Sequence, residues 1–136
     1  MGMVNDYFIS EGNKIGALPT EFGDNVQIKE KKLIADGDIK KGQVVEVSGD
    51  LKVKVTTAAS SNVLGVAMFD AKNGEPVVVE SEGLFKMVAA SAITAPTHIE
   101  SAADGKVAAS TTADNFIGKA ISNAGTDEYV FVKFSI

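Results

Sequence analysis

His98 is the only histidine of this 136-residue chain, and it lies in a short segment, PTHIE, that alternates as a strand does. General acid–base catalysis needs a second group that orients the imidazole, and no partner motif accompanies His98. Serine and threonine cluster over residues 56–61 and 110–112, without a nucleophile elbow or a neighbouring base. These residue types therefore predict polar loops and a strand, and we assign no catalytic residue.

Carboxylates are numerous, with 18 Asp and Glu residues, but no pair is spaced to share a pocket as an acid–base couple. Asp36, Asp38 and Asp50 could be read as a calcium loop, yet their spacing fails the EF-hand pattern and turn formation explains Asp-Gly-Asp more simply. Cysteine is absent, which excludes disulfides and thiolate zinc sites. We therefore expect no metal, no cofactor and no enzymatic activity.

The charge pattern limits the partners. All 13 basic residues are lysines, and the net charge is −5. Specific readers of nucleic acid use the bidentate fork of arginine, so we expect no nucleic-acid partner. No apolar stretch approaches the roughly 18 residues of a membrane span, and residues 1–8 lack the pattern of a signal peptide. We expect no membrane partner either.

Two segments of the chain share one pattern: NVLGVAMFDAKNGEPVVVE from Asn62 and NFIGKAISNAGTDEYVFVKF from Asn115. Within these segments the matching residues are 53 positions apart: Gly65 and Gly118, Ala67 and Ala120, Val77 and Val130, Val79 and Val132. Upstream of them the matching residues are 54 positions apart: Glu46 and Glu100, Asp50 and Asp104, Lys52 and Lys106, Val53 and Val107. One deletion between the two groups explains both offsets. We infer two copies of one β unit, about residues 39–80 and 93–134.

Each unit is expected to contain two strands joined by an Asp-Gly or Gly-Asp turn, at 43–47 with 52–56 and at 97–101 with 106–110. A polar loop, a strand with an internal glycine and a hairpin return follow. Short strands with regular turn signals predict an all-β fold, a compact sandwich or barrel over residues 36–136. Helix signals are restricted to residues 85–95, where the spacing suits a short helix or an irregular crossover ending before Pro96.

Several glycines carry local expectations. Gly65 and Gly118 lie inside apolar strands, which indicates a bulge or a close approach of two backbones. Asn73 and Gly74 suit a two-residue type I′ turn, in which both residues have positive φ. In the last strand Tyr129, Phe131 and Lys133 share one face and Val130, Val132 and Phe134 the other. Because both faces are apolar, we expect this strand to be covered on each side for part of its length.

Residues 1–35 differ from the rest, since their apolar residues follow no period. The aromatic content is high for a disordered linker, so we expect an extended arm with one strand at 25–28. Such an arm is ordered only when it docks. Its own barrel, a neighbouring protomer and another protein are all open as docking partners.

The segment GDLKVKVTTAASSNVLGVAMFDAKNGEPVVVESEGLFKM, which begins at Gly49, resembles the core of the tailed-bacteriophage capsid decoration (cement) proteins. The shared pattern is a hydrophobic-Gly-Val-Ala strand, a glycine turn and a Val-x-Val…x-Gly-x-Phe strand, here residues 64–67, Gly74, residues 77–79, and Gly83 with Phe85. The C-terminal Gly-x-Ala unit at Gly118 resembles the terminal unit of that family, and lambdoid head decoration proteins share a looser version. The resemblance covers about residues 39–136.

The resemblance implies a structural virion protein on the outer surface of an icosahedral head, made in the host cytoplasm. Its partner would be the phage major capsid protein, whose contacts it would stabilise, and it would form a homotrimer. The arm residues are then candidate contacts to capsid or protomer: Tyr7, Phe8, Ile9, Leu18, Pro19 and Phe22. The alternatives are a non-catalytic ligand- or carbohydrate-binding β module and, third, a small enzyme built on a β-barrel.

Overall fold

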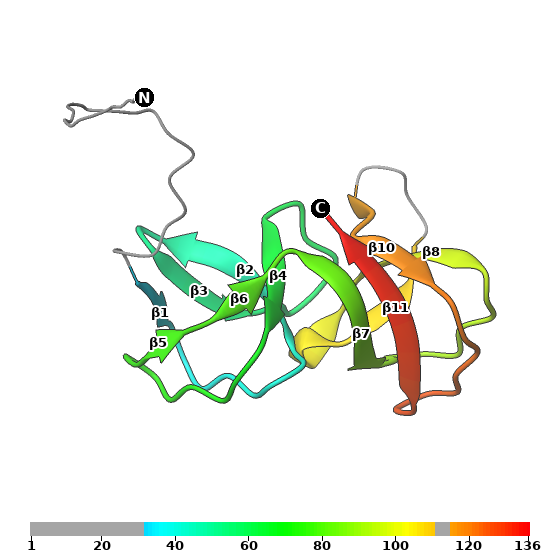
Figure 1. Cartoon of the computed structure of the whole chain (residues 1–136), viewed down its shortest axis with the longest axis horizontal. Coiled ribbons are helices and arrows are strands. Elements are labelled where there is room, and N and C mark those ends of the chain that lie inside the picture. The colour runs from blue at the N-terminus through cyan, green and yellow to red at the C-terminus, as the bar shows by residue number, and fades with distance from the viewer. Residues whose placement is uncertain (1–31, 111–114) are drawn as a thin grey trace, which may run out of the picture. The chain divides into compact units, whose positions relative to one another are not determined.

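The computed structural model describes residues 32–110 and 115–136, and residues 32–136 form one compact unit (Figure 1). Two sheets contain all its strands. The first sheet holds β1 (Leu33–Ala35), β2 (Val44–Gly49), β3 (Lys52–Val55), β4 (Val63–Ala67), β5 (Pro76–Val77) and β6 (Val79–Glu80). The second holds β7 (Glu82–Val88), β8 (Thr97–Ser101), β9 (Val107–Ala109), β10 (Gly118–Ala120) and β11 (Tyr129–Ser135). The all-β prediction is confirmed.

Among the described residues, helical geometry is limited to the single 3₁₀ turn η2 (Ala103–Gly105) and to Asn115, which is also in 3₁₀ conformation. The prediction of a helix or crossover over residues 85–95 is wrong for residues 85–88. These residues belong to β7, which pairs with β11 along its whole length. No helix in the described part of the chain is long and apolar enough to cross a membrane. The strand expected at residues 25–28 lies outside the described residues.

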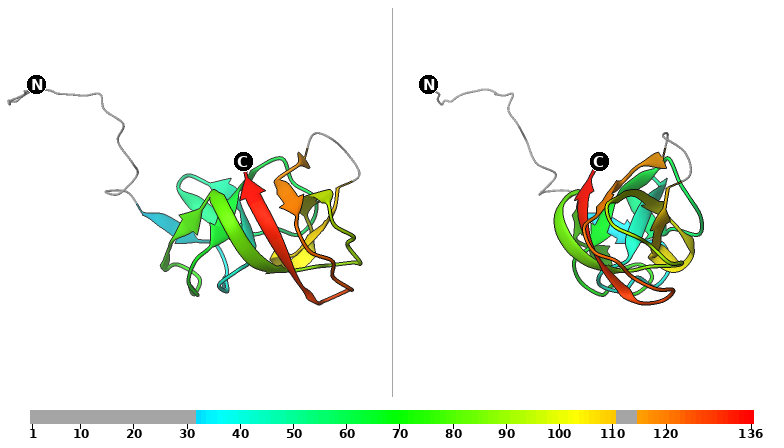
Figure 2. Two further views of the ribbon diagram at one scale, coloured as in Figure 1. Left: turned by 45° about the vertical axis from the view of Figure 1, so that its right-hand side comes forward. Right: turned by 90° about the vertical axis from the view of Figure 1, so that its right-hand side faces the viewer.

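Both sheets curl until their ends meet. In the first sheet the order is β5-β1-β3-β2-β4-β6, and β5 and β6 are one segment interrupted only at Val78, so this segment borders both ends. In the second sheet the order is β7-β11-β10-β8-β9, and a parallel bridge from Ala89 to Val107 links the end of β7 to β9. Each sheet is therefore barrel-like, and β11 runs beside β7 along the second one (Figure 2).

The pairings of the first barrel recur in the second with the offsets of the sequence repeat. Val45 faces Val55 in the first hairpin, and Ile99 faces Ala109 in the second, 54 positions on. The later strands follow the shorter offset: Ala67 pairs with Val79, and Ala120 with Val132, 53 positions on. The paired residues of the two barrels are thus separated by the same numbers of positions as the sequence matches.

The buried side chains form two clusters. One fills the first barrel and includes Val45, Val53 and Val77. The other fills the second barrel, where Val130, Val132 and Phe134 are fully buried, and it also takes in Val44, Val63 and Val66 from the first sheet. Because alternate residues of a strand point to opposite faces, β2 and β4 contribute to both clusters. The second cluster therefore joins the two barrels.

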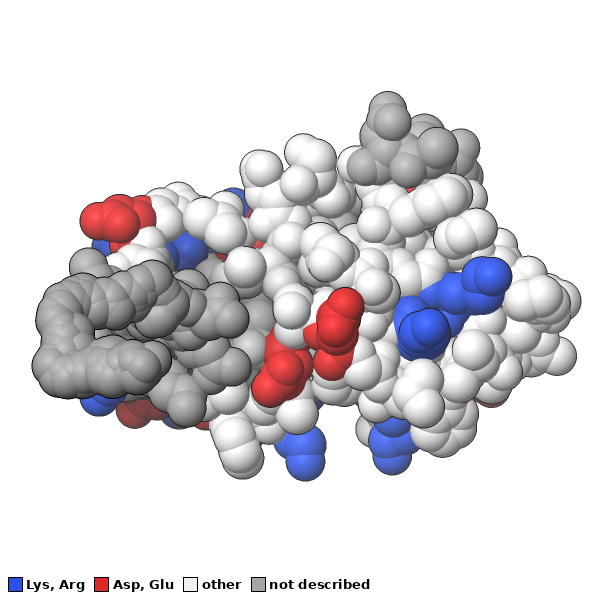
Figure 3. Space-filling view, turned by 45° about the horizontal axis from the view of Figure 1, so that its top comes forward, with Lys and Arg blue, Asp and Glu red and all other residues white. Residues whose placement is uncertain are grey.

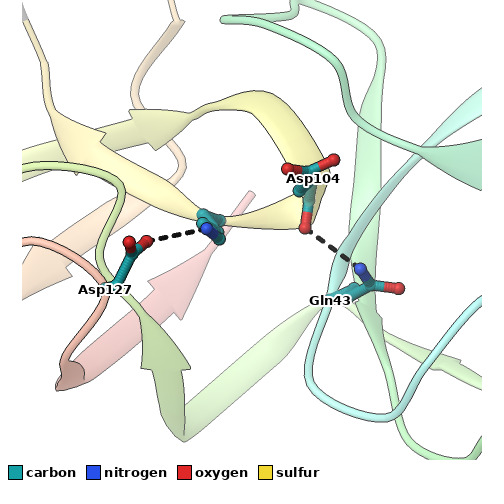
Figure 4. Close-up of polar contacts among 4 residues, drawn as sticks. Gln43, Asp104 and Asp127 are labelled. Carbon is teal, nitrogen blue, oxygen red and sulfur yellow. Dashed lines mark hydrogen bonds and ion pairs between the residues drawn. The ribbon is translucent and has the colours of Figure 1, made fainter.

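A polar seam joins the two barrels beside this core. The buried Thr56 hydroxyl donates to the Ala102 carbonyl at 2.9 Å, and the buried Ser101 hydroxyl donates to the Ala58 carbonyl at 2.8 Å. Gln43 donates from Nε2 to the Asp104 carbonyl at 3.0 Å (Figure 4). These bonds satisfy the polar groups that burial removes from water, so the seam carries no unpaired hydroxyl at Thr56 or Ser101.

One exposed ion pair lies next to the seam. Lys106 Nζ is 2.7 Å from Asp127 Oδ1 (Figure 4). The hydrogen bond to Asp127 raises the pKa of the Lys106 ammonium, and the charge of the same carboxylate adds to this effect. An exposed pair of this kind contributes little to stability because solvent screens it.

The turn at Asn73 and Gly74 differs from the expected type I′. Gly74 has a φ of +86°, but Asn73 is not among the described non-glycine residues with positive φ. With the bond from Glu75 N to the Lys72 carbonyl at 2.9 Å, this is the pattern of a type II turn. Asn73 instead ties two loops together, since its Oδ1 accepts from Gly37 N at 2.8 Å.

Candidate binding surface

The described residues hold no cluster of side chains suited to metal binding. No group of three or more His, Cys, Asp or Glu side chains could hold a metal within residues 32–110 and 115–136. His98 is exposed, and its ring stacks on Phe116 with centroids 4.0 Å apart. The observed ring partner of His98 is therefore the Phe116 side chain, which is not an acid or a base.

A shallow pocket on the first barrel is lined by loop residues, among them Asp38, Asp70 and Lys72. Its carboxylates already hold the loops in place. Asp70 Oδ1 accepts from Lys41 N at 2.8 Å, and Asp38 Oδ1 accepts from Asn73 N at 3.0 Å. The shape of the pocket is therefore set by hydrogen bonds within its own loops.

The most distinctive surface is the outer face of the second sheet. On β11 the inward residues are fully buried, while Tyr129 is 62% exposed and Phe131 is 52% exposed. On the neighbouring strand β7 Leu84 is 72% exposed, and Ile121, directly after β10, is 52% exposed. We define the outer face as these four apolar residues together with the lysines between them: Leu84, Lys86, Lys119, Ile121, Tyr129, Phe131 and Lys133.

Strand register places these side chains in rows across the sheet. Leu84, Lys133 and Lys119 occupy one row, since Lys133 pairs with Leu84 on β7 and with Lys119 on β10. In the next row Phe131 pairs with Lys86, and its carbonyl accepts from Ile121 N at 2.8 Å. Apolar and cationic side chains thus alternate over three neighbouring strands.

The lysines of the outer face have few partners. Lys86 Nζ lies 4.4 Å from the centroid of the Tyr129 ring, a cation–π contact. Lys119 and Lys133 lie directly opposite one another on β10 and β11, and among the described residues neither forms an ion pair. Figure 3 shows lysine side chains grouped over the second barrel among mostly uncharged atoms, with acidic side chains to one side of the group.

The expectation that the last strand is covered on each side is wrong for the described residues, because Tyr129 and Phe131 are exposed. The alternation in 129–134 identified part of this face. Sequence reasoning missed Leu84, Lys86 and Lys119, because residues 82–88 carry apolar side chains on both faces and show no clear alternation.

The remaining residues singled out in the sequence have clear places. Gly65 and Gly118 lie at close approaches to neighbouring strands, where an added Cβ would overlap the Glu80 carbonyl and the Lys133 carbonyl respectively. Gly83 lies on β7 opposite Phe134. The six arm residues named above, from Tyr7 to Phe22, lie outside the described residues.

Two of the comparisons with known proteins found a match. The family model described as "Phage cement protein" matches residues 24–136. The crystal structure of the head fiber gp8.5 N base of bacteriophage phi29 is similar with a TM-score of 0.61 and 17% identity, covering 77% of this chain and 92% of that one. At this identity the likeness concerns the fold alone. No curated protein matches the chain.

Proposed function

The chain belongs to the phage cement protein family, and from this premise we propose that it binds the outside of an icosahedral head and stabilises contacts between major capsid proteins. A structural role in the phage capsid follows from the family. The observation that carries the proposal is the family match, which includes the whole described unit, residues 32–136. We further propose that the protein is made in the host cytoplasm and acts in the virion as a homotrimer.

The physics of such a role requires adhesion and no chemistry. A ligand that binds the mature shell better than the immature shell stabilises the mature one by mass action. Each contact can be weak, since an oligomer that touches several shell subunits gains effective concentration after its first contact. Two barrels fused by a shared core give a rigid body on which such contacts can be fixed.

Co-sedimentation tests the proposal directly. Purified protein is mixed with mature heads of the matching phage that lack it, and separately with unexpanded heads, and both are pelleted. We expect saturable binding to mature heads and little binding to unexpanded heads. Saturating binding should also raise the temperature at which mature heads break open. Absence of the protein from the pellet of mature heads would contradict the proposal.

The arm is proposed to contribute contacts to capsid or protomer through the six residues from Tyr7 to Phe22. Removing residues 1–22 is expected to abolish binding to mature heads while leaving the β unit folded, because that unit has its own core. Circular dichroism and thermal unfolding would check the fold, and co-sedimentation the binding. Full binding by the truncated protein would rule out this role of the arm.

A further inference from the structure

We propose that the outer face of the second sheet is the surface that meets the shell, and that it fits a partner surface combining apolar side chains with carboxylates. This inference rests on the proposed function and adds to it the face and the chemistry of the contact. It involves residues from β7, β10 and β11, all within the described part of the chain.

The outer face exposes large apolar side chains. Leu84, Tyr129 and Phe131 are each more than half exposed. On β11 Phe131 lies two residues from Tyr129 on the same face, and it is diagonal to Leu84, which pairs with Lys133. Single exposed apolar residues are ordinary, but several large ones on one face of a sheet indicate an interaction surface. Aromatic residues such as Tyr129 and Phe131 are also the types that dominate the centres of protein interfaces.

The outer face also carries cationic side chains, and strand register brings two of them together. Lys119 and Lys133 face one another directly across β10 and β11, an arrangement that destabilises a sheet. The equivalent pair of the first barrel is Val66 with Glu80, which has no such repulsion. A partner carboxylate placed between the two ammonium groups would replace repulsion with attraction, and more strongly once water is excluded from the contact.

A protein surface fits this face better than a nucleic acid does. Phosphate backbones are held by arginine and lysine with little use for aliphatic groups, whereas Leu84 and Ile121 lie among the lysines here, and the chain has no arginine. The chain as a whole is acidic, with a net charge of −5, so a second copy is the competing occupant. The test below separates it from the shell.

The variant Lys119→Glu tests the inference on a protein that should fold better than the wild type. It turns the like-charged cross-strand pair into an opposite one, which we expect to raise Tm by about 1–4 °C. The same change should weaken binding to mature heads at least tenfold, because it places a carboxylate against a carboxylate. Lys72→Glu is the matched control, as an exposed lysine of a first-barrel loop, and should bind within twofold of wild type.

Three outcomes would overturn the inference. Wild-type binding to mature heads by Lys119→Glu would show that this face does not meet the shell. A change in the mass of Lys119→Glu in solution without heads, measured by light scattering, would assign the face to a second copy. Failure of the wild type itself to bind mature heads would refute the proposed function, and the inference with it.

Discussion

Replacing Gly118 with alanine is expected to destabilise the fold by about 3 kcal/mol or more, a large part of the stability of a small domain. The new Cβ would overlap the Lys133 carbonyl oxygen and lie 3.0 Å from the Phe134 Cα, so it meets backbone on two sides. Backbone cannot rotate away as a side chain can, and β10 would have to separate from β11. Chemical denaturation of the variant and the wild type measures the loss.

Gly49→Ala is the control for this experiment. An added Cβ at Gly49 meets only the Lys52 side chain, at an ordinary 3.8 Å, so we expect a change within about 0.5 kcal/mol. Gly65→Ala should resemble Gly118→Ala, because its Cβ would overlap the Glu80 carbonyl on the equivalent strand pair. Equal stability of the Gly118 variant and wild type would contradict the close packing of β10 against β11.

Removing the Leu84 and Phe131 side chains from the outer face is expected to weaken binding to mature heads about 100-fold or more. Leu84→Ala with Phe131→Ala deletes neighbouring side chains on β7 and β11 that are 72% and 52% exposed in the free protein. Truncation of central apolar anchors costs roughly 2 kcal/mol each at protein interfaces, and the losses multiply in the affinity. Co-sedimentation over a range of protein concentrations gives the dissociation constant.

The first barrel supplies a matched control for this double variant. Phe69 and Val78 are 65% and 53% exposed there, and Val78 is the repeat equivalent of Phe131. Phe69→Ala with Val78→Ala removes a comparable apolar surface and should bind heads as wild type does. If this control lost affinity and the outer-face variant kept it, the shell would bind the first barrel instead.

The fold class could be predicted from sequence because it depends on local patterns. The offset of 54, then 53, residues is visible in pairs such as Glu46 with Glu100 and Gly65 with Gly118. The structure carries the same offsets into strand pairing, with Val47 facing Val53 and Ser101 facing Val107. Alternating apolar residues and turn signals are enough to define such units.

The exposure of single side chains and the type of one turn could not be predicted, because they depend on parts of the chain that are distant in sequence. In β7 Leu84 is exposed and Met87 is buried, so apolar residues occur on both faces and imitate helical spacing. The turn at Gly74 is type II because Asn73 bonds to distant loop residues, Gly37 and Asp38, which local propensity does not include. Exposure of Tyr129 and Phe131 likewise depends on which of the two apolar faces of β11 packs on the core, and the sequence of the strand alone does not specify this.

A cryo-EM reconstruction of mature heads saturated with the full-length protein tests the central claim most directly. We predict added density on the outside of the shell, with β7, β10 and β11 turned toward the major capsid protein and carboxylates of that protein near Lys119 and Lys133. Density in which this sheet faces solvent while another surface touches the shell, or heads that carry no added density, would contradict it.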